Sequence, residues 1–349
     1  MNAGAAGFCI GDLEEAVGHA SGALRDLDGS SLFLTGGTGF FGRWLLAVLD
    51  HARMRLGLRL QVTLLSRRPE AFAEAHPHLA SLGFLRLVAG DVRSFSFPSR
   101  KFSHIIHAAT DTSAAAGRDP ADLIGSVVDG TRRVLELAAR CEARRLLYVS
   151  SGAVYGPQPP GMAALAEEYS GAPDPLDPRS SYGQAKRLAE HLCALAADRT
   201  GIETVIARAF AFVGPGLPLD GHFAIGNFIR DALAGKEISV GGDGTPVRSY
   251  LYAGDLAAWL PTLLAKGRPG RAYNVGSDRE IRIAELARLV GSVIPGSGEI
   301  VIRGEPDPAA TRNRYVPSIE RARTELALDS WTPLDEAIRR TARYARGEA

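Results

Sequence analysis

The chain has 349 residues, of which 46% are hydrophobic and 23% charged, a balance typical of a globular protein without long disorder. Its 40 basic and 39 acidic residues leave a net charge of +1, which gives no reason to expect a nucleic acid or an anionic membrane as partner. No run approaches the roughly 20 apolar residues of a membrane span. The three cysteines have no metal-ligand spacing, so we expect a cytoplasmic protein without a metal site.

Residues 1–30 are predicted to form a helical extension without chemistry of its own. Segments 12–17 and 22–27 carry apolar residues at helical spacing, and Asp12 is a possible N-cap. We expect this helix to pack on the outside of the first strand.

From residue 31 onward, strand and helix patterns alternate. We predict strands at 31–35, 60–66, 84–88, 103–108, 145–150 and 202–208, and amphipathic helices near 40–57, 69–81, 119–141 and 181–199. Such alternation predicts an α/β fold: a Rossmann-type, doubly wound parallel sheet with helices on both faces.

Turn-rich stretches at 214–218 and 241–246 end this alternation. We therefore expect a dinucleotide-binding Rossmann domain over 31–210, to which 251–275 returns. A smaller C-terminal substrate-binding lobe would comprise 211–250 and 276–349.

The first strand runs into a glycine-rich turn and then a helix, the order that binds a phosphate group at a helix N-terminus. Gly36 would permit a tight turn, Gly39 the approach of backbone N–H groups to a pyrophosphate, and Gly42 close packing of helix and strand. The spacing is Gly-x-x-Gly-x-x-Gly. The other candidate cofactor residues of this turn are Thr38, Phe40 and Phe41.

After the second strand, an NAD-specific protein usually has an acidic residue that binds the ribose hydroxyls. Ser66, Arg67 and Arg68 stand here instead, and a hydroxyl with guanidinium groups suits a 2′-phosphate. NADP(H) is therefore favoured, whereas NAD(H) stays possible if the arginines only begin a solvated helix.

Two further strand ends face the same pocket. Asp91, followed by Val92, could accept a hydrogen bond from the adenine amino group, although a simple loop aspartate is nearly as good an interpretation. The small residues that end the fourth strand would permit close passage of the cofactor, and they are Ala108, Ala109 and Thr110. His107 is expected to be a packed histidine without a catalytic role.

Tyr182 and Lys186 lie four residues apart at the start of a predicted helix and so share one face. A neighbouring ammonium group would lower the pKa of the phenol and make it a usable general acid or base. Ser151, at the end of the fifth strand, could hold a substrate oxygen for proton exchange with Tyr182. Each feature alone is weak, but the three in this order form a strong joint signal.

From about residue 31 to 345 the chain resembles the extended short-chain dehydrogenases/reductases of the NAD(P)-dependent epimerase/dehydratase family, which modify nucleotide-activated sugars. The matching motifs are at 35–42, 150–156, 182–186, 207–210, 213–215, 248–252 with Asp255, and 273–276. The resemblance implies that Ser151, Tyr182 and Lys186 form a catalytic triad, with Lys186 also holding the nicotinamide ribose. It implies that Asn227 and Arg248 face the nucleotide diphosphate of the substrate, with Arg314 a weaker candidate.

Family members also differ in the two residues after the strand-end hydroxyl. The resemblance implies an acidic pair there in 4,6-dehydratases, and a Glu at the second position in decarboxylases, where this chain has Gly152 and Ala153. We therefore expect neither dehydration nor decarboxylation. An NADPH-dependent 4-ketoreductase of a nucleotide-linked 4-keto-6-deoxy sugar is favoured over a 4-epimerase with tightly bound NAD. A noncatalytic NADP-binding regulator is a remote alternative.

The predicted helices near 119–141 and 181–199 each carry an apolar face, which in the resembled family commonly forms a four-helix bundle across a two-fold axis. The residues concerned are Leu123, Val127, Val134, Leu137, Leu188, Leu192 and Leu195. We expect a homodimer, the alternative being that both faces simply cover the sheet.

Overall fold

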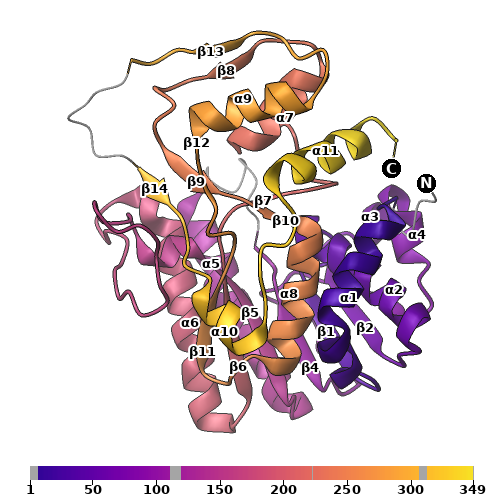
Figure 1. The fold of residues 1–349 in the computed structure, drawn as a ribbon. Helices are drawn as coiled ribbons and strands as arrows, with labels where there is room; N and C mark the ends of the chain where they lie inside the picture. The colour runs from indigo at the N-terminus through magenta and orange to yellow at the C-terminus, as the bar shows by residue number, and fades with distance from the viewer. Residues whose placement is uncertain (1–6, 111–118, 222, 306–312, 349) are drawn as a thin grey trace.

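The computed structural model describes residues 7–110, 119–221, 223–305 and 313–348. Its centre is a seven-stranded parallel sheet in the order β11-β6-β5-β4-β1-β2-β3 (Figure 1). The strands are β1 (Ser31–Thr35), β2 (Gln61–Ser66), β3 (Leu85–Ala89), β4 (His104–His107), β5 (Arg145–Ser151), β6 (Glu203–Ala209) and β11 (Arg271–Val275). The predicted doubly wound α/β fold is confirmed, and the strand order reverses between β1 and β4.

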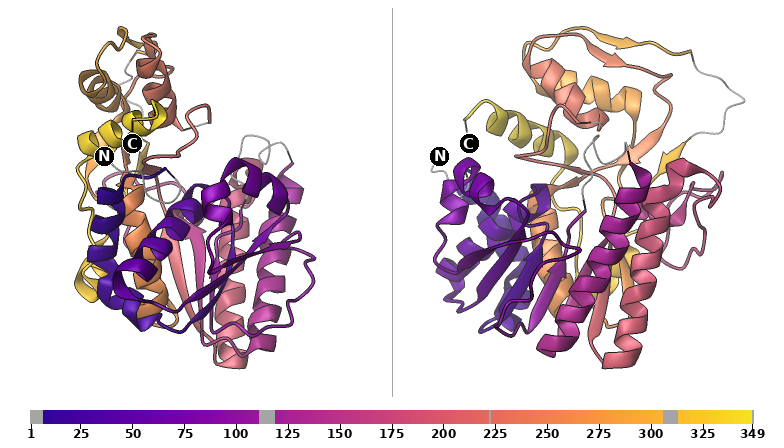
Figure 2. Two further views of the ribbon diagram at one scale, coloured as in Figure 1. Left: turned by 90° about the vertical axis from the view of Figure 1, so that its right-hand side faces the viewer. Right: turned by 180° about the vertical axis from the view of Figure 1, so that it is seen from behind.

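Helices cover both faces of this sheet (Figures 1 and 2). Helices α2 (Phe40–Leu56) and α8 (Ala253–Lys266) lie on one face, and α5 (Pro120–Cys141) and α6 (Ser181–Thr200) lie side by side on the other. Each face has its own hydrophobic cluster, with Trp44 and Trp259 in the first and Phe33 in the second. The β5 strand is buried along its whole length between them.

The helix predicted at 69–81 is split in two. It forms α3 (Pro69–Ala75) and α4 (Pro77–Ala80), because Pro77 lacks an N–H group and its ring cannot continue the preceding helix.

The N-terminal helix α1 (Ile10–Asp26) does not pack against β1 as expected, but against α2 and α8, as a further layer outside them (Figure 2). Its N-cap residue is Cys9 and has no side-chain cap, so the assignment of Asp12 as the cap is wrong. Asp12 is buried instead. Its carboxylate accepts a hydrogen bond from Tyr252 (2.6 Å) and pairs with Arg340 (2.6 Å).

After residue 251 the chain returns to the first domain, where α8 packs and β11 pairs with β6. A smaller group of elements lies above the carboxyl ends of the strands in Figure 1. It comprises α7 (Ala224–Leu233), β8 (Ile238–Val240), β9 (Val247–Ser249), β12 (Glu280–Arg282), α9 (Ile283–Val293), β13 (Ile300–Ile302) and β14 (Arg314–Tyr315). We call this group the C-terminal lobe.

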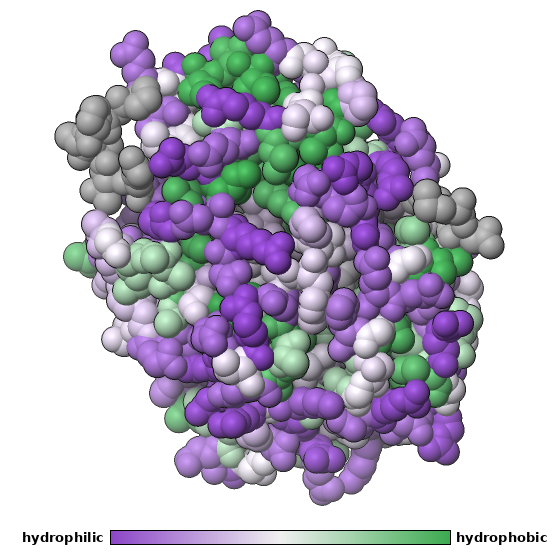
Figure 3. Space-filling model, viewed as in Figure 1, coloured by the Kyte–Doolittle hydropathy of each residue, from purple (hydrophilic) through white to green (hydrophobic). Residues whose placement is uncertain are grey.

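Four further elements complete the fold. The strands β7 (Phe212–Val213) and β10 (Leu251–Tyr252) pair with each other, α10 (Glu320–Leu326) packs on β11, and α11 (Leu334–Ala345) packs on α7 and α9. On the face shown in Figure 3, hydrophobic residues gather mostly over the C-terminal lobe, whereas the lower part is mainly hydrophilic. Among the described residues, no helix is long and apolar enough to cross a membrane.

Candidate active site

The glycine-rich turn between β1 and α2 has a backbone that other residues could not adopt. Gly36 has a φ of 74°, and a Cβ atom there would lie 2.4 Å from the Ala108 carbonyl oxygen. A Cβ on Gly42 would lie 2.1 Å from the Cα of Gly37. The Cβ position of Gly39 is open, with only the Gly36 oxygen near it, at 3.4 Å. No side chain caps α2, so this cradle fits a pyrophosphate at the helix N-terminus.

The end of β4 is fixed to the same turn. The Thr35 hydroxyl accepts a hydrogen bond from the Ala109 N–H (3.1 Å) and lies 2.8 Å from Nδ1 of His107. His107 is fully buried, and burial lowers its pKa to about 3. The interpretation of His107 as a packed histidine is confirmed.

The aromatic residues of the turn lie beside it: Phe41 packs edge-on against Phe212, with 4.7 Å between ring centroids, and adjoins Phe40. Thr38 is partly exposed.

The residues expected at the adenosine end lie on neighbouring strand ends, since Ser66 of β2 pairs with Ala89 of β3. Ser66 is buried, and its hydroxyl accepts a hydrogen bond from the Arg68 N–H (3.2 Å). The side chains of Arg67 and Arg68 are exposed.

Asp91 is bonded to Arg93, whose Nε donates to its carboxylate at 2.9 Å. Arg93 is the main cause of the lowered pKa of Asp91, and the nearby charge of Arg67 contributes to it. Val92 packs on α5, where a Cβ on Gly130 would lie 2.8 Å from it. Asp91 could therefore accept a hydrogen bond from an adenine group only in addition to the hydrogen bonds it already accepts from Arg93.

The three candidate catalytic residues come together where β5 meets the start of α6. The Lys186 ammonium donates to the Val149 carbonyl and to the Thr110 hydroxyl, both at 2.8 Å, and lies 5.9 Å from the Tyr182 ring centroid. The Ser151 side chain neighbours the Tyr182 hydroxyl.

Gly183 permits this approach of helix and strand. A Cβ at residue 183 would lie 2.6 Å from the Ala153 carbonyl oxygen, so a larger residue would push α6 away from the end of β5. Thr110, predicted as a cofactor residue, here also holds Lys186.

Burial dominates the electrostatics of this group. It lowers the pKa of Lys186 to about 7, against the opposing effect of Glu190. Burial also raises the pKa of Tyr182, and the contact with Ser151 opposes that rise. The expectation that Lys186 would lower the pKa of Tyr182 is wrong for this structure, because desolvation of the phenol outweighs an ammonium group that is directed at Val149 and Thr110.

Tyr315 is a residue of this site that the sequence did not reveal. Its hydroxyl neighbours the Ser151 side chain, and its ring packs on Phe210 with 4.6 Å between centroids. The neighbouring candidate, Arg314, pairs instead with Glu280 and donates to the Ala163 carbonyl. Side chains alternate in a strand, so the two residues of β14 face opposite sides. No local sequence signal indicates that Tyr315 meets a serine so distant in the chain.

The two remaining substrate candidates lie in the C-terminal lobe. Asn227 of α7 accepts a hydrogen bond from Arg230 (3.1 Å) and lines a cavity of about 280 Å³. The other lining residues come from α7, β8, the following glycine-rich turn and the start of α9; they are Ala224, Phe228, Ser239, Val240, Gly241, Gly242, Gly244, Pro246 and Ile283.

Arg248 of β9 is half-buried, and partial burial lowers the pKa of its guanidinium group. It donates only to the Val247 and Asn313 carbonyls and, in the part of the chain that the structure describes, pairs with no carboxylate. Its charge acts on Tyr315, so it lies near the triad. A half-buried guanidinium that pairs with no described carboxylate suits an anionic ligand.

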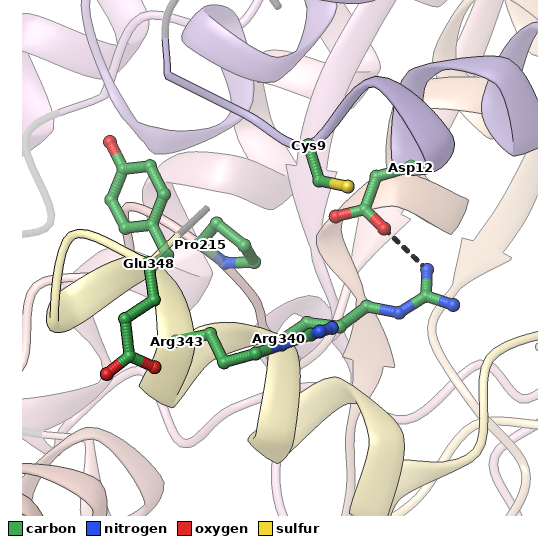
Figure 4. A pocket seen from close by; sticks show the side chains of 7 residues that line it. Cys9, Asp12, Pro215, Arg340, Arg343 and Glu348 are labelled. Carbon is green, nitrogen blue, oxygen red and sulfur yellow. Dashed lines mark hydrogen bonds and ion pairs between the residues drawn. The ribbon is translucent and has the colours of Figure 1, made fainter. Parts of the chain in front are cut away.

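Another cavity, of about 10 Å³, lies between α1 and α11 (Figure 4). The ion pair of Asp12 with Arg340 borders it, together with Cys9, Pro215, Arg343, Tyr344 and Glu348. A space of this size holds about one water molecule, so it cannot be the site of a nucleotide.

The site combines a doubly wound sheet, a glycine cradle after β1 and, at the carboxyl edge, the residues Ser151, Tyr182 and Lys186. This arrangement is that of the dinucleotide-dependent short-chain dehydrogenases/reductases. The family model described as the NAD dependent epimerase/dehydratase family matches residues 32–276, which is more than half of the chain. The chain therefore belongs to this family, as the resemblance implied.

Curated relatives carry the name UDP-glucuronic acid decarboxylase. The protein of that name from Xenopus tropicalis is 33% identical over 219 residues, 63% of this chain and 51% of that protein. One from Arabidopsis thaliana is 31% identical over 303 residues, 86% of this chain and 66% of that protein. The chain thus spans about half to two thirds of the length of these relatives.

Solved structures share the fold. The UDP-glucose 4-epimerase of Thermotoga maritima has a TM-score of 0.76 at 21% identity, covering 90% of this chain and 98% of that one. The UDP-glucuronic acid 4-epimerase of Bacillus cereus, solved with UDP-glucuronic acid and NAD, has a TM-score of 0.76 at 20% identity, covering 90% and 99%.

Proposed function

We propose that this protein is an NADPH-dependent 4-ketoreductase of a nucleotide-linked 4-keto-6-deoxy sugar. The observation that carries the proposal is the Ser151, Tyr182 and Lys186 group at the end of β5, followed by two residues without ionisable side chains. Such a set can exchange one proton with a sugar oxygen, but it offers no second acid or base for loss of water.

When bound, the dinucleotide supplies the hydride that adds to the C4 carbonyl of the sugar. The Tyr182 hydroxyl donates its proton to the carbonyl oxygen, and the Ser151 hydroxyl donates a hydrogen bond that orients it. Lys186, held by Val149 and Thr110, places positive charge beside the phenolate that forms.

The nucleotide half of the substrate would occupy the C-terminal lobe. Arg248 offers a half-buried positive charge near Tyr315, and Asn227 borders a cavity of about 280 Å³, slightly below the range of small-ligand pockets. The similar proteins are named for UDP-sugars, which supports a nucleoside diphosphate sugar as the substrate class.

Decarboxylation is not proposed, although the curated relatives are named for it. Ala153 has no carboxylate where the resemblance implies a Glu in decarboxylases. The space beside Gly152 is filled, since a Cβ there would lie 2.6 Å from the Tyr315 hydroxyl and 2.7 Å from Cζ of Phe210. The acidic residue that the resemblance implies at position 152 in dehydratases therefore does not fit this packing, so dehydration is not proposed either.

A 4-epimerase is the second candidate, and the solved epimerase of Bacillus cereus with NAD favours it. The same triad serves both reactions. The difference lies in the cofactor, because an epimerase keeps its NAD whereas a reductase exchanges NADPH. Arg67 and Arg68, exposed at the end of β2, support the exchangeable, phosphorylated cofactor.

Mass spectrometry under native and denaturing conditions, followed by dinucleotide titration, tests the choice. We expect an empty protein that binds NADPH at least 10-fold more tightly than NADH. The double change Arg67→Ser with Arg68→Ser should remove most of that preference, whereas Arg86→Ser on β3, also an exposed arginine, should not. Retained NAD would favour the epimerase and would contradict the role of Arg67.

A further inference from the structure

A polar row crosses three neighbouring strands at the carboxyl edge of the sheet. Ser150 of β5 is in register with Arg208 of β6, and Arg208 is in register with Asn274 of β11. Residues paired in this way lie side by side on one face of a parallel sheet. Ser150 directly precedes Ser151 in β5, so this row of polar residues is adjacent to the triad.

Glu190 ties this row to the helix that carries Tyr182 and Lys186. Its Oε1 accepts hydrogen bonds from the Ser150 hydroxyl (2.6 Å) and from Nε of Arg208 (3.1 Å), and its Oε2 pairs with Arg208 at 2.7 Å. The side chains of Arg208 and Glu190 are only 17% and 13% exposed. Glu190 lies one helical turn after Lys186, which is itself bonded to Val149. Consecutive residues of β5 therefore hold successive turns of α6.

Tyr155 extends the row toward the C-terminal lobe. Its hydroxyl accepts a hydrogen bond from Arg208 (2.9 Å) and donates one to the Asn274 side-chain oxygen (2.7 Å). The Asn274 amide nitrogen donates to the carbonyls of Leu165 (2.8 Å) and Ser318 (3.0 Å). Ser318 follows Tyr315 by three residues, so an unbroken chain of hydrogen bonds links α6 to the segment 313–318.

We propose that Glu190, Arg208, Tyr155 and Asn274 form a positioning network that holds the triad in register with the segment 313–318 of the C-terminal lobe. The catalytic part of this inference rests on the proposed function. Arg208 and Glu190 neutralise each other, and none of the four residues is needed for the proton or hydride transfer. Their effect is geometric: a displacement of about 1 Å at the reacting atoms can reduce a rate about 100-fold.

The variant Tyr155→Phe breaks the network at one atom and keeps the ring and the ion pair. Tyr273→Phe is its matched control, because Tyr273 is also buried and its hydroxyl also bonds a side chain, Glu325, at 2.7 Å. Both variants lose one buried hydroxyl, but only the first interrupts the path from α6 to 313–318.

Amide hydrogen exchange of the full chain tests the coupling without a substrate. We expect Tyr155→Phe to speed exchange about 10-fold or more in peptides covering both 149–153 and 313–318, and Tyr273→Phe to leave both unchanged. If Tyr155→Phe speeds exchange in these peptides no more than Tyr273→Phe does, the network does not couple the two regions.

Turnover separates this proposal from the proposed function. With the nucleotide sugar that the wild type reduces, Tyr155→Phe should lower kcat 10- to 100-fold, and Tyr273→Phe less than 2-fold.

Glu190→Gln should change the pH profile of turnover. The limb of the profile that follows the titration of Lys186 should move to lower pH, since Glu190 raises the pKa of Lys186. Full activity of Tyr182→Phe would refute the proposed function and leave the exchange result standing. An inactive Tyr182→Phe with a fully active Tyr155→Phe would refute the network alone.

Discussion

At the scale of single residues, Gly152 is closely packed by Tyr315 and Phe210. We predict that Gly152→Ala lowers the free energy of unfolding by about 1–3 kcal/mol, because the added Cβ would overlap Tyr315 and Phe210. Gly83→Ala is the control, since no atom lies within 4 Å of its Cβ position. Urea unfolding of both variants measures the difference, and an equal cost would show that the packing around Gly152 is loose. Gly152→Asp should be inactive rather than a dehydratase.

Lys186 makes stability depend on pH. Burial lowers its pKa from 10.5 to about 7, so between these values the unfolded state binds more protons than the folded state. Buried Lys186 therefore destabilises the folded state by its full amount below pH 7, and this destabilisation declines as the pH rises toward 10.5. The stability gained by Lys186→Met, measured as its free energy of unfolding minus that of the wild type, should therefore be larger at pH 6 than at pH 9. A difference that is the same at both pH values would contradict the lowered pKa.

The sequence indicated Ser151, Tyr182 and Lys186 because each belongs to a local motif, and the structure brings them together. It could not indicate Tyr315, since that contact is set by the path of the chain through the C-terminal lobe. The direction of the pKa shift of Tyr182 was also beyond the sequence, because it depends on how much of the phenol is buried.

At the scale of elements, α1 is fixed to α11 by a buried ion pair. The side chains of Arg340 and Asp12 are 15% and 5% exposed. We predict that Arg340→Gln lowers the free energy of unfolding by about 3–5 kcal/mol, because Asp12 would keep a buried charge without its partner. Arg339→Gln should cost less than about 1 kcal/mol, since Arg339 pairs with Asp335 at the surface. Chemical denaturation compares the two, and a similar loss in both would mean that α1 does not depend on this pair.

Six strands of the sheet could be predicted to within about one residue, because buried parallel strands appear as uninterrupted apolar runs. The seventh, β11, was expected only as part of the segment 251–275 that returns to the first domain. The strands of two or three residues in the C-terminal lobe could not be, since they are too short to show a periodicity. The expected packing of α1 on β1 failed for a different reason. An amphipathic pattern shows that a helix has a buried face, but it does not show which element covers that face.

At the scale of the whole molecule, we propose a homodimer formed through α5 and α6. The predicted apolar faces of these helices divide into two sets. Val127, Val134 and Leu137 are buried against the sheet, whereas Leu188 and Leu195 are each 43% exposed. Ile124 of α5 is also exposed, at 39%. Exposed apolar side chains on two adjacent helices suit a two-fold interface.

Light scattering at micromolar concentration tests this assembly. The wild type should have the mass of a dimer, and the double change Leu188→Glu with Leu195→Glu should have that of a monomer. Leu176→Glu, in a loop where the side chain is 89% exposed, should remain dimeric. A monomeric wild type would refute the proposal.

The most direct test of the proposed reaction uses a labelled hydride. NADPH carrying deuterium in place of both hydrogens at C4 of the dihydronicotinamide is incubated with a nucleotide-linked 4-keto-6-deoxy sugar, and the product is examined by mass spectrometry and NMR. We expect deuterium at C4 of the sugar with wild-type protein, and a loss of at least 100-fold in rate with Tyr182→Phe. Absence of deuterium from the sugar, or equal rates for the two proteins, would contradict the proposed reaction.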